Sequence, residues 1–572
     1  MSNFQERANF IWQVADDILR GVFKNYEYGD VVLPFTVLRR LDCVLEPSKD
    51  KVIETFEQFK AQLPEAQLSP ILLQASGGHN FYNTSHYDLR RLAQDAPNIE
   101  TNFNNYLNGY SQNVRDIIEN FNLDKVVARL AKNNLLFMLV DKFTEVDLHP
   151  SLVPNHEMGQ IYEELLRRFS EMSNETAGDH YTPREVIRLM VNLLLAEHKD
   201  ELQGKGIIRS VYDPAGGTGG MVINAKDHIQ SQINPDVEIV MYAQELNAQT
   251  YAIAKSDVLI MGENAENVRL GNSFTEDRFP GMTFDLMLSN PPFGVSWKKE
   301  QRFIKQEASD PYGRFQAGLP RVSNGSLLFL QHMLAKMSAK GSRIAIIFNG
   351  SPLFTGDAGS GESDIRKWII ENDWLEAIVA LPTDLFYNTG IATYIWILTN
   401  RKSAKRRGKV QLIDASSYHQ PMRRSLGNKR KLISEAQIGA ITDLYTAFAE
   451  GEQVKIFDNA AFGYTKVRVE RPKRNKKGQV VTDTSGQPKP DSSLRDYEKI
   501  PLTDDIEAYF AREVQPHVPD AWLDRSQDKV GYEISFNQYF YTYTPLRPLA
   551  EIKADILVLE RETDGLLAEI LD

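Results

Sequence analysis

The sequence has little cysteine, no long apolar run and no excess of positive charge. Its 572 residues include one cysteine, Cys43, which excludes a disulfide framework and a zinc site built from several cysteines. No apolar stretch approaches the roughly 20 residues of a membrane helix, and the opening MSNFQERANF lacks the apolar centre of a signal peptide. We therefore expect an intracellular, cytoplasmic protein with no metal site and no membrane partner.

The net charge of −12 argues against a protein that wraps nucleic acid over its whole surface. Positive charge is instead local, in RKSAKRRGK (401–409), RRSLGNKRK (423–431) and KVRVERPKRNKK (466–477). Solvated loops and phosphate contacts both explain such segments. Composition leaves this choice open.

Apolar periodicity divides the chain into four parts. Residues 1–150 repeat apolar positions at helical spacing, which predicts a helical N-terminal domain. From about residue 207 short apolar strands alternate with helical stretches, which predicts an α/β catalytic domain over 151–400 with a mostly parallel sheet. Only TDLFYNTGI separates EAIVALP from ATYIWILTN, too short for a parallel crossover, so we expect these two strands to form a hairpin at the sheet edge.

The last two parts are a C-terminal extension with basic loops (401–545) and a helical tail (546–572). In the tail, positions spaced by three and four residues form a short heptad seam, apolar at six of seven places. They are Leu549, Ile552, Ile556, Leu559, Thr563, Leu566 and Ile570.

The stretch SVYDPAGGTGG (210–220) predicts a ligand-binding turn after the first strand. The strand ends at Asp213, and Gly216, Gly217, Gly219 and Gly220 allow a tight turn and a close approach of backbone to ligand. The pattern fits neither the dinucleotide fingerprint nor the phosphate-binding P-loop. No Lys or Arg lies between residues 210 and 225, which favours a neutral or cationic nucleoside such as S-adenosylmethionine over a phosphate ligand.

The next two strands add polar groups at the same sheet edge. VEIVMYAQE ends in Glu245, where a carboxylate can accept hydrogen bonds from two ribose hydroxyls. NVRLGNSF carries Asn272, whose amide can read an adenine edge. Upstream, Thr182-Pro183-Arg184-Glu185 predicts a capping box with proline at the first helical position, and Tyr181 and Thr182 can line the same pocket.

The corner DLMLSNPPFG (285–294) predicts the reacting centre. Two prolines make it stiff, and it follows the fourth strand at the ligand-binding edge. The Asn290 side-chain oxygen and the Pro291 carbonyl can each accept a hydrogen from an adenine amine, which aims the nitrogen lone pair at a methyl group. Phe293 can stack on a base turned out of the duplex.

In this order along the chain, YGDVVLPFTVLRRLD, MGQIYEELLRRFSE, HYTPREV, DPAGGTGG, SNPPFG and DLFYNTGIATYIWIL resemble the modification subunit of type I restriction–modification systems. The resemblance covers nearly the whole chain. It implies a class I S-adenosylmethionine-dependent methyltransferase fold and N6-adenine methylation of double-stranded DNA. It also implies a specificity subunit, a restriction subunit and two modification subunits for each specificity subunit.

The predicted site residues follow from these motifs. The catalytic set is Asn290, Pro291, Pro292 and Phe293. The cofactor-binding set is His180, Tyr181, Thr182, Pro183, Arg184, Asp213, Ala215, Gly216, Thr218, Gly219, Gly220, Glu245 and Asn272. Asn272 stands where relatives often carry an acidic residue.

Three other functions share parts of this pattern. The Asn-Pro-Pro-aromatic corner also serves enzymes that methylate protein glutamine or RNA guanine amines, but those are usually compact and lack the helical leader and tail. A binding protein that lost catalysis would not need Asn290, Phe293 and Glu245 together. Phage-defence methyltransferases outside the type I systems remain as an alternative.

Overall fold

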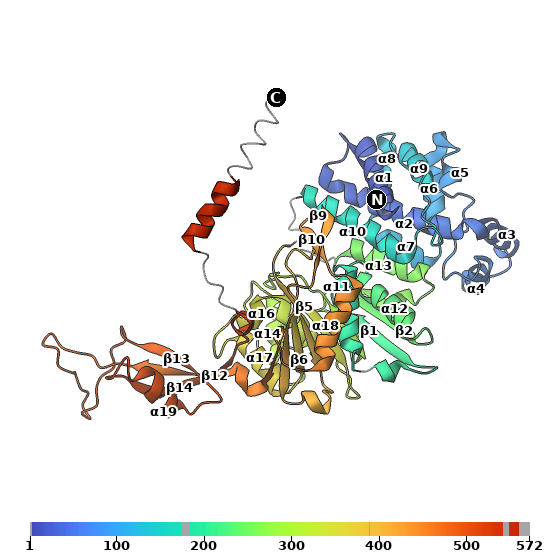
Figure 1. Cartoon of the computed structure of the whole chain (residues 1–572). Helices are drawn as coiled ribbons and strands as arrows, with labels where there is room; N and C mark the ends of the chain where they lie inside the picture. The colour runs from blue at the N-terminus through green and yellow to red at the C-terminus, as the bar shows by residue number, and fades with distance from the viewer. Residues whose placement is uncertain (1–2, 174–181, 198, 388, 542–547, 560–572) are drawn as a thin grey trace. The chain divides into compact units, whose positions relative to one another are not determined.

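The computed structural model describes residues 3–173, 182–197, 199–387, 389–541 and 548–559 (Figure 1). The chain forms two compact units, Met1–Ile534 and Ser535–Asp572. No helix in the described part combines the length and apolar character needed to cross a membrane.

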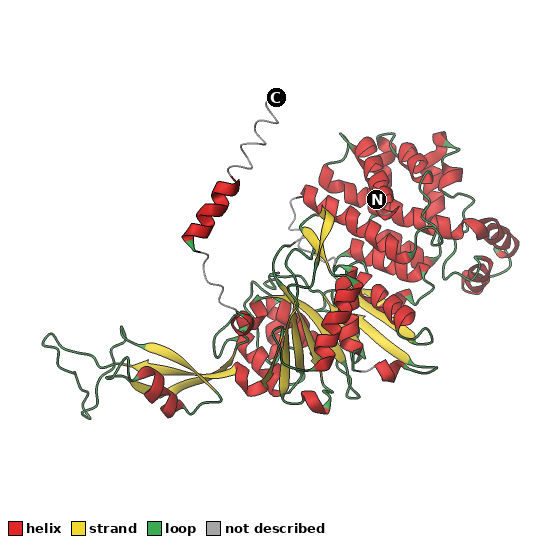
Figure 2. Cartoon of the chain, viewed as in Figure 1, coloured by secondary structure: helices red, strands yellow, loops and turns green. Residues whose placement is uncertain are grey.

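The N-terminal part of the first unit is helical, as the periodicity predicts (Figure 2). Its helices are α1 (Asn3–Leu19), α2 (Tyr28–Leu45), α3 (Lys49–Phe59), α4 (Glu65–Ala75), α5 (Leu89–Leu92), α6 (Ile99–Asn108), α7 (Gln112–Asn120), α8 (Leu123–Lys132) and α9 (Leu136–Thr144). Helix α2 is buried from Val31 to Leu45, which places it at the centre of this part.

Two buried arginines of α2 fix the connection to the following domain. Arg39 donates to the carbonyl of Val146 at 2.6 Å, and Arg40 donates to the carbonyls of Leu148 and Val153 at 2.5 and 2.7 Å. Both guanidinium groups therefore satisfy backbone acceptors that no secondary structure would satisfy. The bonds hold the segment that leads into α10 (Asn155–Ser173) against the helical domain.

A nine-stranded sheet forms the core of the next part, in the order β11-β8-β6-β7-β5-β4-β1-β2-β3. Its strands are β1 (Ile208–Asp213), β2 (Glu238–Glu245), β3 (Val268–Leu270), β4 (Leu286–Ser289), β5 (Arg343–Asn349), β6 (Leu375–Ala380), β7 (Thr393–Thr399), β8 (Lys409–Asp414) and β11 (Val454–Asp458). Strands β1 to β5 pair in parallel, and β7 runs antiparallel to both β5 and β6.

Strands β6 and β7 are buried along their whole lengths, which shows that both faces of the sheet are covered there. Helix α11 packs against both α12 and α18 (Figure 1). The helices of this part are α11 (Arg184–Leu195), α12 (Gly220–Gln232), α13 (Ala248–Ile260), α14 (Gln301–Ala308), α15 (Ser326–Ala335), α16 (Ser351–Phe354), α17 (Gly361–Glu371) and α18 (Glu435–Ala447).

The structure corrects the position of the expected edge hairpin. Strands β6 and β7 are antiparallel neighbours, as their short connection predicts. They lie inside the sheet, however, because β8 pairs in parallel with β6 and β11 pairs with β8. The buried Val410-Gln411-Leu412-Ile413 run of β8 extends the core into the segment after residue 400.

Two smaller β structures complete the first unit. The hairpin of β9 (Gln420–Leu426) and β10 (Lys429–Leu432) follows β8. Strands β12 (Gly463–Glu470), β13 (Asp496–Pro501) and β14 (Trp522–Tyr532) form a second sheet, which also carries α19 (Ile506–Tyr509). A largely exposed loop connects β12 to β13, within the extension for which the sequence predicts basic loops.

The second unit contains α20 (Phe536–Phe540) and a helix over 549–559. The heptad positions Leu549, Ile552, Ile556 and Leu559 are all exposed on that helix, Leu549 by 83%. Thr563, Leu566 and Ile570 lie outside the described residues.

Candidate active site at the carboxyl edge of the sheet

The ends of the parallel strands bring the predicted groups to one edge of the sheet. Strand β1 ends at Asp213, β2 ends at Glu245, and β4 ends at Ser289, immediately before Asn290. Strand β3 ends at Leu270, two residues before Asn272. Because parallel strands share one carboxyl edge, the glycine turn and the proline corner lie at the same edge, which is where ligands bind in open α/β sheets.

The glycine turn passes tightly over the neighbouring strand. The Gly216 N–H donates to the Gln244 carbonyl at 2.9 Å, and a Cβ added at Gly216 would lie 3.0 Å from the Ala243 Cβ. Gly219, with φ of +81°, caps the start of α12 in the left-handed conformation. A side chain at Gly216 would therefore fit only if the turn or Ala243 moved by a few tenths of an ångström. The turn thus fits a ligand that needs a close approach of backbone.

Glu245 holds the same turn through its carboxylate. One oxygen accepts the Gly217 N–H at 2.8 Å, and the other accepts the Asn247 N–H at 2.7 Å. A carboxylate oxygen has two acceptor positions, so each oxygen can still take a hydroxyl hydrogen. The strand end therefore suits a diol such as a ribose.

Asp213 makes contacts within the protein, and its predicted contact with a cofactor stays a prediction. It is 2% exposed, and one carboxylate oxygen accepts both the Ala215 N–H at 2.9 Å and the Ser289 hydroxyl at 2.8 Å. Burial raises the pKa of Asp213 to about 7, although both hydrogen bonds favour its ionised form. The residue joins the glycine turn to the residue that precedes Asn290. These two hydrogen bonds fix the position of the glycine turn relative to the proline corner.

The proline corner contains an unsatisfied polar atom. Pro291 is buried, Pro292 and Phe293 are half-buried, and Phe293 packs against the core. The Asn290 side-chain oxygen is buried and has no hydrogen-bond partner among the residues that the structure describes. Such a group costs about 1–3 kcal/mol of stability, and it is rare enough in folded proteins to need an explanation. An acceptor kept ready for a substrate amine provides one.

Asn272 is engaged within the protein. Its side-chain oxygen accepts the Phe274 N–H at 2.9 Å, and its amide nitrogen donates to Glu300 at 3.2 Å. Asn272 therefore shapes the loop after β3. An adenine contact would compete with these two bonds.

The segment before α11 lies beside the glycine turn. Arg184 donates to Asn224 at 3.0 Å, and Asn224 donates to the Gly220 carbonyl at 2.7 Å. Thr182 and Pro183 are buried. His180 and Tyr181 lie outside the described residues.

The expected capping box is wrong in detail. Helix α11 begins at Arg184 with Pro183 as its N-cap residue, and no side chain caps it. The carboxylate of Glu185 instead pairs with Lys429 at 2.5 Å. The local pattern predicts that Glu185 caps the helix start, but its carboxylate contacts Lys429, which lies far along the chain.

Three residues that the sequence did not indicate support the site. Ser289 binds Asp213, and the Ser273 hydroxyl donates to the Pro214 carbonyl at 2.6 Å. Arg314 donates to the carbonyls of Ser273 and Phe274, each at 2.7 Å. Ser289 belongs to the quoted corner and was within reach of sequence reasoning. Arg314 lies in a loop with no motif.

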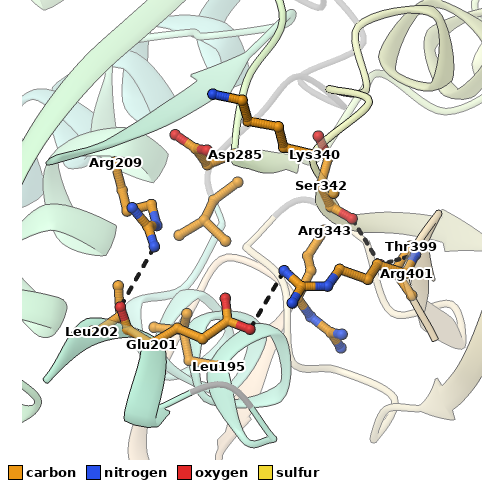
Figure 3. Close-up of a pocket in the computed structure, with 12 residues that line it drawn as sticks. Leu195, Glu201, Leu202, Arg209, Asp285, Lys340, Ser342, Arg343, Thr399 and Arg401 are labelled. Atoms are coloured by element: carbon orange, nitrogen blue, oxygen red, sulfur yellow. Dashed lines mark hydrogen bonds and ion pairs between the residues drawn. The ribbon is translucent and has the colours of Figure 1, made fainter. Parts of the chain in front are cut away.

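A pocket of about 200 Å³ lies at the opposite edge of the sheet (Figure 3). Its lining includes Arg209 and Arg343 at the starts of β1 and β5, together with Thr399 at the end of the reversed strand β7. It therefore stands apart from the glycine turn and the proline corner. In the described part of the chain, no three His, Cys, Asp or Glu side chains gather as a metal site requires.

Comparison with protein families gives two matches that together span most of the chain. Residues 154–468 match the family described as N-6 DNA Methylase. Residues 7–143 match the family described as HsdM N-terminal domain. The first match contains the glycine turn, Glu245 and the proline corner.

Individual relatives agree with these matches. The chain is 27% identical over 463 residues to the type I restriction enzyme MjaIX methylase subunit of Methanocaldococcus jannaschii, covering 78% of each chain. It is 32% identical over 260 residues to the HindI methylase subunit of Haemophilus influenzae, covering 45% of this chain and 54% of that one. Among solved structures, the type I methyltransferase subunit of Streptococcus thermophilus has a TM-score of 0.60 at 20% identity. That match covers 80% of this chain and 96% of the other.

Proposed function

The chain belongs to the N-6 DNA methylase family, and on this premise we propose that it transfers a methyl group from S-adenosylmethionine to the N6 amine of adenine in specific DNA sites. The observation that carries the proposal is the buried, unpartnered side-chain oxygen of Asn290 at the edge that also holds the glycine turn and Glu245. The class I methyltransferase fold and the S-adenosylmethionine cofactor follow from the same family.

The residues present fit the cofactor. The glycine turn offers close backbone contact, Glu245 offers acceptor positions for the ribose hydroxyls, and the segment of Thr182 to Arg184 lies beside the turn. The bound cofactor supplies an electrophilic methyl group on a sulfonium. The protein contributes position and hydrogen-bond acceptors.

The proline corner can prepare the amine for attack. The N6 nitrogen of adenine is a poor nucleophile because its lone pair is delocalised into the ring. When the Asn290 side-chain oxygen and the Pro291 carbonyl each accept one amine hydrogen, the lone pair is directed out of the ring plane and toward the methyl group. Preorganised acceptors of this kind favour the transition state over the ground state. Phe293 can stack on the extruded base.

Paired variants of the two halves of the site test the proposal. The chain, co-expressed with the specificity subunit in a bacterium without adenine methylation, should add N6-methyladenine at defined genomic sites. Asn290→Ala should lower methyl transfer at least about 1000-fold, equivalent to about 4 kcal/mol, and leave S-adenosylmethionine affinity within a few-fold. Glu245→Ala should show the opposite pattern, because its first effect should be a loss of S-adenosylmethionine affinity. Normal turnover by Asn290→Ala would refute the role of the corner.

We propose that the chain acts in the cytoplasm as the modification subunit of a type I complex, with a specificity subunit, a restriction subunit and two copies of itself for each specificity subunit. The curated relatives are named as subunits. The helix over 549–559 supports a partner, because Leu549, Ile552, Ile556 and Leu559 expose apolar surface at heptad spacing. We assign that surface to helices of the specificity subunit.

Deleting residues 546–572 tests this assignment. The truncated chain should fold, bind S-adenosylmethionine and no longer co-purify with the specificity subunit. A matched control that replaces only Leu549 and Ile556 by Ser should give the same loss without shortening the chain. Assembly and site-specific methylation by both variants would show that the tail has no role in docking.

A further inference from the structure

The three basic segments of the sequence differ in what their charges contact. In 401–409, Lys402 pairs with Asp373 at 2.6 Å, and Lys405 and Arg406 both pair with Glu197, at 2.8 and 2.9 Å. This segment connects the end of β7 to the start of β8, so it lies at the edge opposite the glycine turn. These three ion pairs hold the fold together.

In the segment 466–477, Lys466 and the three arginines form ion pairs, whereas the exposed Lys473, Lys476 and Lys477 form none within the described ranges. Arg471 and Arg474 pair with Asp520 at 3.0 and 3.1 Å. Arg468 pairs with Asp524 at 3.0 Å. These contacts join β12 to β14 and to the segment before it. They explain the arginines by structure alone.

The hairpin of β9 and β10 is different. Arg423, Arg424 and Arg430 are exposed, and within the described ranges of the chain no acidic side chain forms an ion pair with any of them. Strand β9 is exposed or half-exposed along its whole length. No core contact therefore explains this strand or its charge.

The hairpin rises from the edge that carries the candidate active site. Strands β5 and β6 are both antiparallel to β7, and β8 is parallel to β6. Strand β8 therefore ends, at Asp414, on the same edge as β1 and β4. The hairpin begins six residues later, at Gln420, and Figure 1 shows it beside α10.

Internal contacts fix the hairpin in place. Lys429 is 3% exposed, donates to the Leu385 carbonyl at 2.9 Å and pairs with Glu185 in the first turn of α11. The N–H groups of Asn428 and Arg430 donate to carbonyls of the loop after β6, at 2.8 and 2.9 Å. The adjacent Arg184 reaches the glycine turn through Asn224. The ribbon is thus rigidly linked to the site while its arginines project into solvent.

We propose that the β9–β10 hairpin binds the phosphate backbone of the substrate DNA duplex beside the adenine that the proline corner receives. The inference rests on the proposed function and adds to it a DNA contact made by this chain's own residues. A chain with net charge −12 needs local positive charge to approach DNA, and phosphate contacts supply most of such affinity.

The geometry of a ribbon suits a duplex. Successive strand residues point to opposite faces, so Arg423 and Arg424 place one guanidinium on each face of the hairpin. A two-stranded ribbon fits the major groove of DNA, where one phosphate backbone runs along each side. Each arginine would then meet a different strand. Bidentate pairing with phosphate oxygens is the geometry that arginine favours.

Charge removal in the assembled complex tests the proposal. Arg423→Gln with Arg424→Gln, in the full chain bound to its specificity subunit, should weaken binding of a fluorescein-labelled duplex containing the target site roughly tenfold at about 0.1 M salt. The slope of log affinity against log salt should fall by about 2 for each copy of the chain. At saturating DNA the methylation rate should stay within a few-fold of wild type.

Two matched variants separate local contact from general charge. Lys340→Gln with Arg407→Gln removes two exposed charges at the opposite sheet edge and should leave DNA affinity unchanged. Arg423→Lys with Arg424→Lys keeps both charges and should retain most of the affinity. Equal losses in the hairpin and control variants, or an equal loss with lysine and with glutamine, would overturn the proposal.

The remaining outcomes distinguish a failure of the hairpin inference from a failure of the proposed function. If wild type methylates adenine but the glutamine pair binds DNA with unchanged affinity and salt slope, the hairpin is not a DNA contact and the proposed function stands. If the glutamine pair fails to assemble with the specificity subunit, the hairpin binds protein instead, which also overturns the inference. If wild type methylates no adenine, the function fails and the inference fails with it.

Discussion

Two buried carboxylates in one sheet differ in whether a cation pairs with them and in the direction of their pKa shifts. Glu376, near the start of β6, is fully buried and accepts hydrogen bonds from Arg343 at 2.5 Å and from the Tyr445 hydroxyl at 2.7 Å. Burial opposes ionisation of Glu376, but Arg343 and Arg406 outweigh it and lower its pKa. Asp213, at the end of β1, is almost as buried, yet within the described residues no cation pairs with it, and burial raises its pKa to about 7.

The difference separates the two edges of the sheet by role. At the amino edge, Glu376 is paired with Arg343 and with the more distant Arg406, so its charge serves stability, although one Glu376 oxygen and two Arg343 nitrogens find no hydrogen-bond partner among the described residues. At the carboxyl edge, and counting only the described residues, Asp213 has no cation, the Asn290 oxygen has no donor, and Arg423 and Arg424 have no acidic partner. Buried polar groups without partners cost stability and need an explanation, and at the carboxyl edge a ligand provides one. The difference between the two carboxylates is therefore one of charge pairing, and the unpaired charge lies at the edge that carries the glycine turn and the proline corner.

The largest expected effect lies at the amino edge. Arg343→Met should destabilise the chain by about 3–5 kcal/mol, because it leaves Glu376 buried with only the more distant Arg406, at 3.9 Å, as a cation. Urea unfolding followed by circular dichroism measures this. S-adenosylmethionine affinity of the fraction that remains folded should not change.

A second variant checks that the lost charge is the cause. Arg343→Met combined with Glu376→Leu removes both partners and should recover part of the stability, since an apolar pair can replace a buried ion pair. If the double variant is less stable than the single one, the amino edge does not depend on this pairing.

The second prediction concerns pH at the carboxyl edge. The folded protein holds the Asp213 proton up to about pH 7, whereas the unfolded chain releases it near pH 4. Between these values the folded state binds more protons, so wild-type stability falls as pH rises. About three pKa units at about 1.4 kcal/mol each set an upper limit of about 4 kcal/mol.

Asp213→Asn should remove that dependence, because the amide stays neutral and can still accept from Ala215 and Ser289. Relative to wild type, the variant should gain unfolding free energy at pH 8 and show little gain at pH 4. The measurement is urea unfolding across this range without cofactor. A constant difference from pH 4 to pH 8 would mean that Asp213 is ionised in the fold throughout.

Local sequence signals predict the carboxyl edge far better than the amino edge. The ends of β1 and β2 at Asp213 and Glu245 follow from short apolar runs that stop at polar residues. The glycine turn and the proline corner are also local, since they depend on the backbone freedom or stiffness of adjacent residues. These signals lie within single segments of about ten residues.

The rest depends on partners far apart in the chain. The pairing of Arg343 with Glu376 joins two separate strands, and β8 takes its place beside β6 through surface that becomes available only after the sheet forms. Glu185 is drawn from its expected helix cap by Lys429, 244 residues away. No spacing rule identifies such partners, so the sequence predicts the edge hairpin in the wrong position and misses the ion-pair cluster.

The smallest expected effect sharpens the comparison, because Phe293 contributes to both stability and substrate contact. Its ring is half-buried against the core at the carboxyl edge. Phe293→Ala should weaken the grip on an extruded adenine by about 1–3 kcal/mol, the usual range for a base stacked on an aromatic ring. A duplex with 2-aminopurine at the target position reports this as a smaller fluorescence rise on binding. Phe293→Tyr keeps an aromatic face and should preserve the response, and neither variant should alter S-adenosylmethionine affinity more than a few-fold.

If alanine leaves the fluorescence unchanged and lowers only the unfolding free energy, Phe293 belongs with the paired charges of the amino edge as a structural residue. Base contact would then rest on other groups of the corner.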